Sequence, residues 1–196
     1  MLPRFELLMP ETLPEALEML SSRAPSVRPL AGGTNLIPDM RAGTHSPATI
    51  VNVDGLRGLR GIRLENGHVV VGAAVTIAEL LDSDVIAEHG GLLRQAAGVF
   101  ANPLVRNRAT IGGNLGNASP AADMAPPLLT LDAEVRLATR DGSRWVDLAD
   151  LFVHVCKTVC EPEELITAIR WPVAAAGGAG AFRKLALRRS MAISVV

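Results

Sequence analysis

Aromatic residues are scarce in this sequence, and their scarcity argues against one large group of functions. Phe, Trp and Tyr together make up 3% of the 196 residues, and Tyr is absent. Proteins that hold single-stranded nucleic acid stack bases on aromatic side chains inside a basic groove. The formal net charge of −1 offers no basic excess either. We therefore expect no nucleic-acid partner.

The sequence also contains few cysteines and no long apolar segment. The two cysteines, Cys156 and Cys160, stand four positions apart, and a structural zinc site would need two more ligands. The longest apolar run, residues 69–81, is too short to span a bilayer. The first residues lack the charged and apolar regions of a signal peptide. These absences predict a cytoplasmic protein with reduced thiols, no bound metal and no membrane span.

Familiar catalytic and nucleotide-binding motifs are missing as well. The sequence has no G-x-S-x-G and no H-E-x-x-H, and its four histidines are scattered without ligand spacing. It has no G-x-x-x-x-G-K-[ST] loop, which argues against a nucleoside triphosphatase. The lack of G-x-G-x-x-G argues against a Rossmann dinucleotide fold. No residue is predicted to be catalytic.

Two glycine-rich segments are the most distinctive features that the sequence does contain. One reads L-A-G-G-T-N-L over residues 30–36, and the other opens A-T-I-G-G-N-L-G-N-A-S-P-A-A-D at Ala109. Glycine adopts positive φ readily and lets another group approach the backbone closely. Amides exposed in such turns bind phosphate. We expect Gly112, Gly113 and Gly116 to form such a turn, and the two segments to enclose one diphosphate.

Periodicity and turn residues predict a small α/β unit at the N-terminus. Thr12 and Glu15 have the spacing of a capping box before a helix that ends near residue 22. The other elements expected here are strands at residues 27–31 and 48–53 and a helix at 34–41. The second strand is apolar on both faces, as in a buried parallel sheet. We assign residues 1–57 to this first subdomain.

The remainder is expected to combine hairpins with helices. Asn66-Gly67 and Asp141-Gly142 each separate two short strand-like runs and predict hairpins. Further elements are expected as helices at residues 76–81, 85–100 and 120–131 and as a strand at 164–171. We assign residues 58–173 to a second subdomain built on a larger mixed sheet.

The last residues are interpreted as the beginning of a further domain. An Ala/Gly-rich joint at residues 174–180 precedes a strand expected at 181–187. The chain then stops inside an apolar run at residues 193–196. Residues 174–196 are therefore predicted to be a linker and the first strand of a truncated C-terminal domain.

Three charged residues beside the second glycine-rich segment leave two interpretations open. Arg106 and Arg108 precede the segment and would either neutralise phosphate charge or be exposed arginines on a strand. Asp123 would lie in the first turn of the helix at 120–131. An acid there either favours the helix dipole or has a binding role.

Both glycine-rich segments resemble those of a known protein family. The segments A-G-G-T-N-L-I-P-D-M and T-I-G-G-N-L-G-N-A-S-P-A-A-D are similar to those of the FAD-binding medium subunits of molybdenum hydroxylases, the carbon monoxide dehydrogenase and xanthine dehydrogenase family. The likeness extends over the whole chain and includes F-A-N-P-L-V-R, E-E-L-I-T-A-I and F-R-K, in the expected order. It implies an α+β, PCMH-type FAD-binding fold with the two subdomains described above.

The resemblance also implies a role for individual residues. One side of the FAD diphosphate would be wrapped by Ala31, Gly32, Gly33, Thr34, Asn35 and Leu36. The other side would be met by Thr110, Gly112, Gly113 and Asn114. Phe100, Leu165 and Ile166 would pack on the rings. Asp123 would bind ribityl or ribose hydroxyls, and Lys184 would lie beside the isoalloxazine, where a cation stabilises reduced flavin.

The function implied by the resemblance is electron transfer within a heterotrimer. Electrons would pass from a molybdopterin-containing large subunit, through a [2Fe–2S] small subunit, to this FAD and then to NAD or another acceptor. Two other readings stay open. The chain could be a truncated remnant that keeps the fold without a cofactor, or a stand-alone flavoprotein oxidoreductase related to vanillyl-alcohol oxidase or UDP-acetylenolpyruvoylglucosamine reductase. The inserted four-cysteine loop of the hydroxybenzoyl-CoA reductase subunits is absent from this sequence.

Overall fold

The computed structural model describes residues 1–173, 180–188 and 192–194, and its N-terminal part is built on a small parallel sheet. Its strands are β1 (Glu6–Leu8), β2 (Val27–Leu30) and β3 (Thr49–Asn52), in the order β1-β3-β2. Central β3 pairs in parallel with both neighbours, and its residues Ile50 and Val51 are fully buried. The expected parallel strand with two apolar faces is thus confirmed.

Two helices accompany this sheet. Helix α1 (Leu13–Arg23) begins at Thr12, whose side chain accepts a hydrogen bond from the Glu15 N–H group. The Glu15 carboxylate accepts from the Glu11 N–H rather than from Thr12, so the expected capping box is only half formed. Helix α2 (Leu36–Ala42) follows the first glycine-rich segment and ends at Gly43. The apolar face of α1 packs into the core shared with β2 and β3.

The larger sheet has five strands in the order β4-β5-β10-β6-β7. They are β4 (Ile62–Glu65), β5 (His68–Gly72), β10 (Leu165–Pro172), β6 (Glu134–Thr139) and β7 (Gly142–Asp147). Every neighbouring pair runs antiparallel, so parallel and antiparallel pairing are divided between the two sheets. Both predicted hairpins, β4–β5 and β6–β7, are confirmed, and so is the α+β class.

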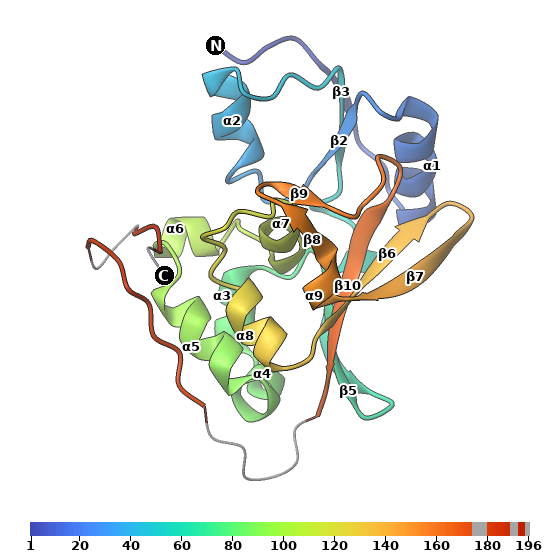
Figure 1. The fold of residues 1–196 in the computed structure, drawn as a ribbon. Coiled ribbons are helices and arrows are strands. Elements are labelled where there is room, and N and C mark those ends of the chain that lie inside the picture. The colour runs from blue at the N-terminus through green and yellow to red at the C-terminus, as the bar shows by residue number, and fades with distance from the viewer. Residues whose placement is uncertain (174–179, 189–191, 195–196) are drawn as a thin grey trace.

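Short helices cover one face of the larger sheet (Figure 1). These elements are α3 (Ile77–Asp82), α4 (Asp84–His89), α5 (Gly91–Val99), α6 (Pro103–Arg106), α7 (Ile111–Gly116), α8 (Ala125–Thr130) and α9 (Leu148–Leu151). The short helix η1 (Arg57–Leu59) packs instead in the core that contains α1. A small hairpin of β8 (Phe152–His154) and β9 (Lys157–Thr158) lies between this layer and the N-terminal part. None of the helices in the described part of the chain is both long and apolar enough to cross a membrane.

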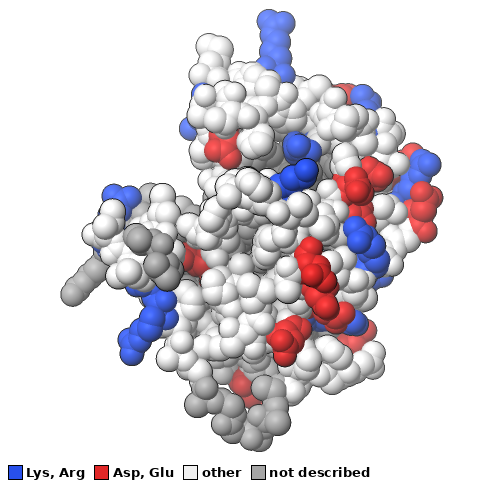
Figure 2. Space-filling view, in the orientation of Figure 1, with Lys and Arg blue, Asp and Glu red and all other residues white. Residues whose placement is uncertain are grey.

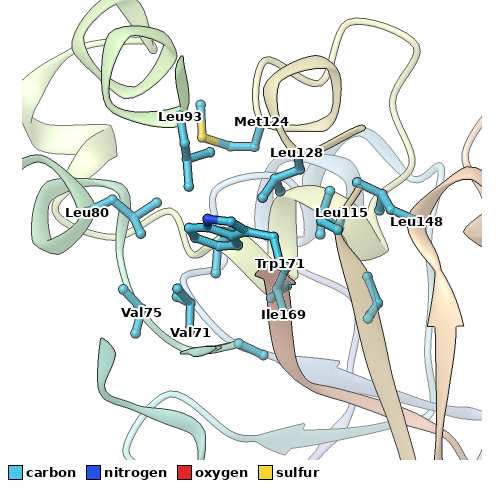
Figure 3. Packing of buried hydrophobic residues seen from close by; sticks show 14 of the residues in the cluster. Val71, Val75, Leu80, Leu93, Leu115, Met124, Leu128, Leu148, Ile169 and Trp171 are labelled. Carbon is cyan, nitrogen blue, oxygen red and sulfur yellow. The ribbon is translucent and has the colours of Figure 1, made fainter. Parts of the chain in front are cut away.

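Trp171 lies at the centre of the core between the larger sheet and its helices (Figure 3). Its side chain is fully buried, and its indole N–H donates to the His89 carbonyl at 2.9 Å. The surrounding side chains come from the sheet and from helices α3, α5, α7, α8 and α9, and include Val71, Leu80, Leu93, Leu115, Leu128, Leu148 and Ile169. A buried Trp contributes a large apolar area and needs a partner for its N–H, and both conditions are met here.

Two of the predicted helices are wrong in extent. The helix expected at residues 85–100 is divided into α4 and α5 at Gly90, where the His89 carbonyl accepts from Trp171 and the φ and ψ angles of Gly90 are −140° and 36°. The helix expected at 120–131 contains only α8. Pro126 and Pro127 explain its late start, because proline is favoured in the first turn of a helix, where its missing N–H is not needed.

The expected strand at residues 181–187 is also wrong. This part of the chain forms only an isolated bridge between Ala186 and Ser194. Instead of pairing in a sheet, it is held by the Gln95 side chain of α5, which donates to the Gly180 carbonyl and accepts from the Phe182 N–H. Most of the proposed Ala/Gly joint lies outside the described residues, as do residues 195–196 of the final apolar run.

Candidate cofactor-binding site

A cavity of about 680 Å³ lies where the N-terminal part meets the larger sheet and its helices. This volume falls in the range of small-molecule and cofactor sites. Its walls are the first glycine-rich segment, helix α7, the β8–β9 hairpin and the N-terminal end of β10. In Figure 2 the surface is hollowed between the regions of α2 and β9, with charged side chains at the edge of the hollow.

The first glycine-rich segment presents free backbone donors to this cavity. The N–H groups of residues 32–36 have no hydrogen-bond partner within the described ranges. Gly33 has a φ of 71°, a left-handed conformation that few other residues adopt without strain. Gly32 lies against the Arg108 carbonyl oxygen, which would be 1.8 Å from an added Cβ. The predicted turn is therefore present and is shaped to receive an anion.

The second glycine-rich segment differs from the prediction. It is a helix, α7, and none of Gly112, Gly113 and Gly116 has a positive φ. Thr110 is its N-cap and accepts from the Gly113 N–H at 3.1 Å. The Ile111 and Gly112 N–H groups donate to the carbonyls of Val75 and Ala73 at 2.9 Å each. Because these donors already have partners, the start of α7 offers no free amide there for a phosphate.

Gly112 is needed in α7 for packing. A Cβ at this position would lie 2.6 Å from the Ala73 Cβ and 2.8 Å from the Ala73 carbonyl oxygen. The helix can therefore approach the segment after β5 only without a side chain at this point. The close approach expected at this glycine is present, but the approaching group is Ala73 of the protein rather than a ligand.

The apolar wall of the cavity includes Phe100, Leu165 and Ile166. Their packing on a cofactor ring stays a prediction. Consecutive residues of a regular strand point to opposite faces of the sheet. Here the pairing of β10 with β6 shifts register between Ile166 and Ala168, which is the pattern of a β-bulge. This shift follows Ile166, so Leu165 and Ile166 still lie on opposite faces of β10 and pack in different cores. Both line the cavity because the strand begins beside it.

Asp123 and Lys184 do not line the cavity in this structure, although each was predicted to contact the cofactor. They form a buried ion pair with 2.6 Å between Lys184 Nζ and Asp123 Oδ2. The second carboxylate oxygen accepts from the Ser194 hydroxyl at 2.8 Å. Asp123 precedes α8 and lies outside the helix, so the helix-dipole interpretation is wrong. These contacts fasten Lys184 and Ser194 to the loop that follows α7.

The two arginines that precede α7 have protein partners. Arg106 belongs to α6 and donates from Nη1 to the Phe100 carbonyl at 2.7 Å. Arg108 forms an ion pair with Asp54 at 3.1 Å. Neither residue lines the cavity and neither belongs to a strand. The expected strand is therefore wrong, although Arg108 is exposed as expected, and a role in neutralising phosphate charge stays a prediction.

Several residues that line the cavity were not identified from the sequence. They are contributed mainly by β2, by the loop after α2 and by the β8–β9 hairpin, and they include Arg28, Asp39, His45, Cys156, Lys157, Cys160 and Glu164. Burial raises the pKa of the Cys160 thiol. A two-point hydrogen bond from Arg144, at 2.8 and 2.9 Å, lowers the pKa of the Glu164 carboxyl. A hairpin of so few residues carries almost no periodic signal, which is why this wall was missed.

Comparison with known proteins agrees with this architecture. The family described as "FAD binding domain in molybdopterin dehydrogenase" matches residues 3–174. The carbon monoxide dehydrogenase medium chain of Afipia carboxidovorans is 36% identical over 181 residues, which cover 92% of this chain and 63% of that one. A putative xanthine dehydrogenase FAD-binding subunit of Escherichia coli is 33% identical over 94% of this chain and 64% of that one.

Solved structures show the same fold. Carbon monoxide dehydrogenase from Hydrogenophaga pseudoflava superposes with a TM-score of 0.95 at 32% identity, covering 98% of this chain and 67% of that one. The chain thus belongs to the FAD-binding domain family of the molybdopterin dehydrogenases, as a relative of the medium subunits that bind FAD in molybdenum hydroxylases. It spans less than two thirds of the length of the curated relatives named above.

The cavity offers groups that fit FAD. The free amides of residues 32–36 suit the oxygens of a diphosphate, which only accept hydrogen bonds. On the opposite wall, the Asn114 side-chain oxygen is buried and has no hydrogen-bond partner among the described residues. A buried polar atom of this kind is costly unless something pairs with it. FAD has hydroxyl groups that could donate to this oxygen, so the two walls match two parts of one cofactor.

Proposed function

We propose that this chain is the FAD-binding electron-transfer part of a heterotrimeric molybdenum hydroxylase. Its partners would be a molybdopterin-containing large subunit and a [2Fe–2S] small subunit, with NAD or another compound as the external acceptor. The bound FAD supplies the redox chemistry, and the protein supplies binding, orientation and electrostatics. The observation that carries the proposal is the cavity between the free amides of residues 32–36 and α7, in a chain of this family.

The proposed roles follow the two walls of the cavity. Residues 31–36 would hold the diphosphate through their backbone N–H groups. On the α7 side, the Asn114 side chain and the Thr110 hydroxyl would bind hydroxyl groups of the cofactor, while Gly112 and Gly113 keep the helix close to its neighbours. Phe100, Leu165 and Ile166 would pack against a ring.

Asp123 and Lys184 are given an indirect role in this proposal. Ser119 lines the cavity, and Asp123 lies four residues further along the same loop. Because both members of the ion pair are nearly buried, with side-chain exposures of 8% for Lys184 and 7% for Asp123, they hold the loop firmly. The ion pair would therefore keep the Ser119 side of the cavity in place without contacting the cofactor.

Titration of the purified chain with FAD tests the proposal directly. We expect saturable quenching of flavin fluorescence and a visible flavin spectrum that remains after removal of free FAD. An unsaturable titration would favour a remnant that keeps the fold without a cofactor. Reduction of bound FAD by a small-molecule substrate of the chain alone would instead favour a stand-alone flavoprotein.

The partner assignment needs a separate experiment. The chain should be co-expressed, with an affinity tag, together with the proteins encoded by its flanking genes. Co-purification of a molybdopterin protein and a [2Fe–2S] protein would support the heterotrimer. A tagged chain that binds FAD and retains neither protein would leave the cofactor assignment intact and contradict the assembly.

A further inference from the structure

The diphosphate of FAD brings two negative charges into the cavity, and backbone amides alone offer only partial positive charge. The two cations that precede the second glycine-rich segment, Arg106 and Arg108, are bound to the Phe100 carbonyl and to Asp54. Neither of them faces the cavity. Other cationic side chains that line the cavity are therefore the candidates for offsetting this charge.

Two other cationic side chains line the cavity from different walls. Arg28 belongs to β2, which leads directly into the first glycine-rich segment, and Lys157 begins β9. Neither side chain has an ion-pair or hydrogen-bond partner among residues 1–173, 180–188 and 192–194. Many of the other arginines are already bound to carboxylates, namely Arg23, Arg60, Arg63, Arg108, Arg140, Arg144 and Arg170.

The backbone beneath Lys157 is held in place at the cavity. The N–H group of Cys156, at the turn between β8 and β9, donates to the Ala118 carbonyl at 2.9 Å. This bond ties the tip of the hairpin to the loop that follows α7. The stem of Lys157 is therefore fixed relative to the cavity, while its ammonium group stays exposed and free to reach a ligand.

The acidic groups of the cavity do not cancel these two cations. Glu164 is held by the Arg144 guanidinium at 2.8 and 2.9 Å, so its charge is already paired. Asp39, in the first turn of α2, is the other carboxylate in the lining. Two unpaired cations therefore face one unpaired carboxylate, and His45 adds positive charge only when it is protonated.

We propose that Arg28 and Lys157 provide the counter-charges for the diphosphate of FAD, one from each side of the cavity. This inference rests on the proposed function, because it takes FAD as the ligand. Both side chains are exposed, so each contributes modestly, and salt weakens the contribution. Their placement on separate walls allows both to act on one diphosphate while the amides of residues 32–36 fix its orientation.

The test is a fluorescence titration of the full chain with FAD and, separately, with riboflavin, which has no phosphate. The variants are Arg28→Gln, Lys157→Gln and their combination. Arg63→Gln is the matched control, because it removes one exposed positive charge from β4 at a position outside the cavity. Thermal unfolding of each variant verifies that the fold is retained.

At low salt we expect each single substitution to weaken FAD binding about five-fold, and the double substitution to weaken it roughly twenty-fold. High salt should reduce these differences, while riboflavin binding and the control should stay unchanged. Equal losses for FAD and riboflavin, or variants that bind FAD as the control does, would overturn the inference and leave the proposed function standing. A wild-type chain that binds no FAD would overturn both.

Discussion

The two glycine-rich segments of this protein look alike in sequence and do different work in the structure. Residues 32–36 keep their backbone N–H groups free beside the cavity, and Gly33 has a positive φ. In α7 the first N–H groups are bonded within the protein, and Gly112 serves close packing. Paired glycines therefore do not by themselves identify a phosphate-binding turn. The partners of the adjacent amides decide between a ligand-binding and an architectural role.

The largest expected effect is a loss of stability when the ion pair that holds the loop after α7 is broken. Lys184→Met should lower the free energy of unfolding by about 3 kcal/mol, because it leaves the buried Asp123 carboxylate without its cation. Arg183→Met is the matched control, since Arg183 is the exposed neighbour in the same segment. Urea denaturation measures both variants, and equal stabilities would show that the ion pair does not fasten this loop.

The next prediction contrasts neighbouring glycines within α7. Gly112→Ala should cost about 2 kcal/mol of stability, because the new Cβ would overlap the backbone and side chain of Ala73. Gly113→Ala should cost about 1 kcal/mol, because the close atom is the Thr110 side-chain oxygen at 2.8 Å and its rotation would sacrifice only the cap of α7. Thermal and urea unfolding report the difference. A larger loss for Gly113→Ala would contradict the packing role of Gly112.

A third prediction separates backbone strain from cofactor binding in the first segment. Gly33→Ala and Gly43→Ala place alanine at φ angles of 71° and 79°, and each should cost about 1 kcal/mol of stability. Gly43 follows α2 and lies outside the cavity, with open space around it. Only the Gly33 variant should therefore lose FAD affinity in a fluorescence titration. Equal FAD affinities of the two variants would show that the turn at Gly33 is not part of the binding site.

The N-cap residues of α7 and α2 should differ by a smaller amount in their contribution to stability. Thr110→Ala should cost about 1 kcal/mol, because the Thr110 hydroxyl caps α7. Asn35 occupies the same position before α2 but makes no side-chain capping bond, so Asn35→Ala should leave stability nearly unchanged. Chemical denaturation compares them. Equal destabilisation would mean that Asn35 has a structural role like that of Thr110.

The smallest expected effect is the pH dependence of stability that comes from Glu164, which lines the cavity just before β10. Because Arg144 lowers the pKa of Glu164 in the folded protein, this pair stabilises the fold above the unfolded-state pKa of the carboxyl. The contribution disappears as the pH falls through the lower folded-state pKa. Glu164→Gln should remove this acid-dependent part, and Glu18→Gln, at an exposed pair, serves as control. Unfolding followed from neutral to acidic pH would show the difference, and parallel curves would contradict it.

Much of the fold was predictable because it depends on local signals. Asn66-Gly67 and Asp141-Gly142 specify their hairpins, and the spacing of Ala16, Leu17 and Leu20 specifies α1. The division of α4 from α5 was not predictable in this way. It depends on a hydrogen bond between Trp171 and the His89 carbonyl, which are 82 residues apart.

In the candidate site, too, features set by neighbouring residues were predictable and features set by residues distant in the sequence were not. The cavity is lined by residues that the sequence had assigned to one site, namely residues 31–36, Phe100, Leu165 and Ile166. The helical form of residues 111–116 was missed because its first amides are satisfied by carbonyls of Ala73 and Val75, more than thirty residues earlier. The pairing of Asp123 with Lys184 was missed for a similar reason, since each residue alone is an equally good ligand for a cofactor.

The central strand β10 links the cavity to the deepest part of the core. It is bonded to β5 on one side and β6 on the other, its first residues line the cavity, and Trp171 near its end is fully buried. Amides in such a strand exchange with solvent only when much of the protein opens. We therefore expect the cavity wall formed by Leu165 and Ile166 to exchange slowly, and the amides of residues 32–36, which have no partner among the described residues, to exchange quickly. Cofactor binding would join the most protected region of the chain to one of its least protected.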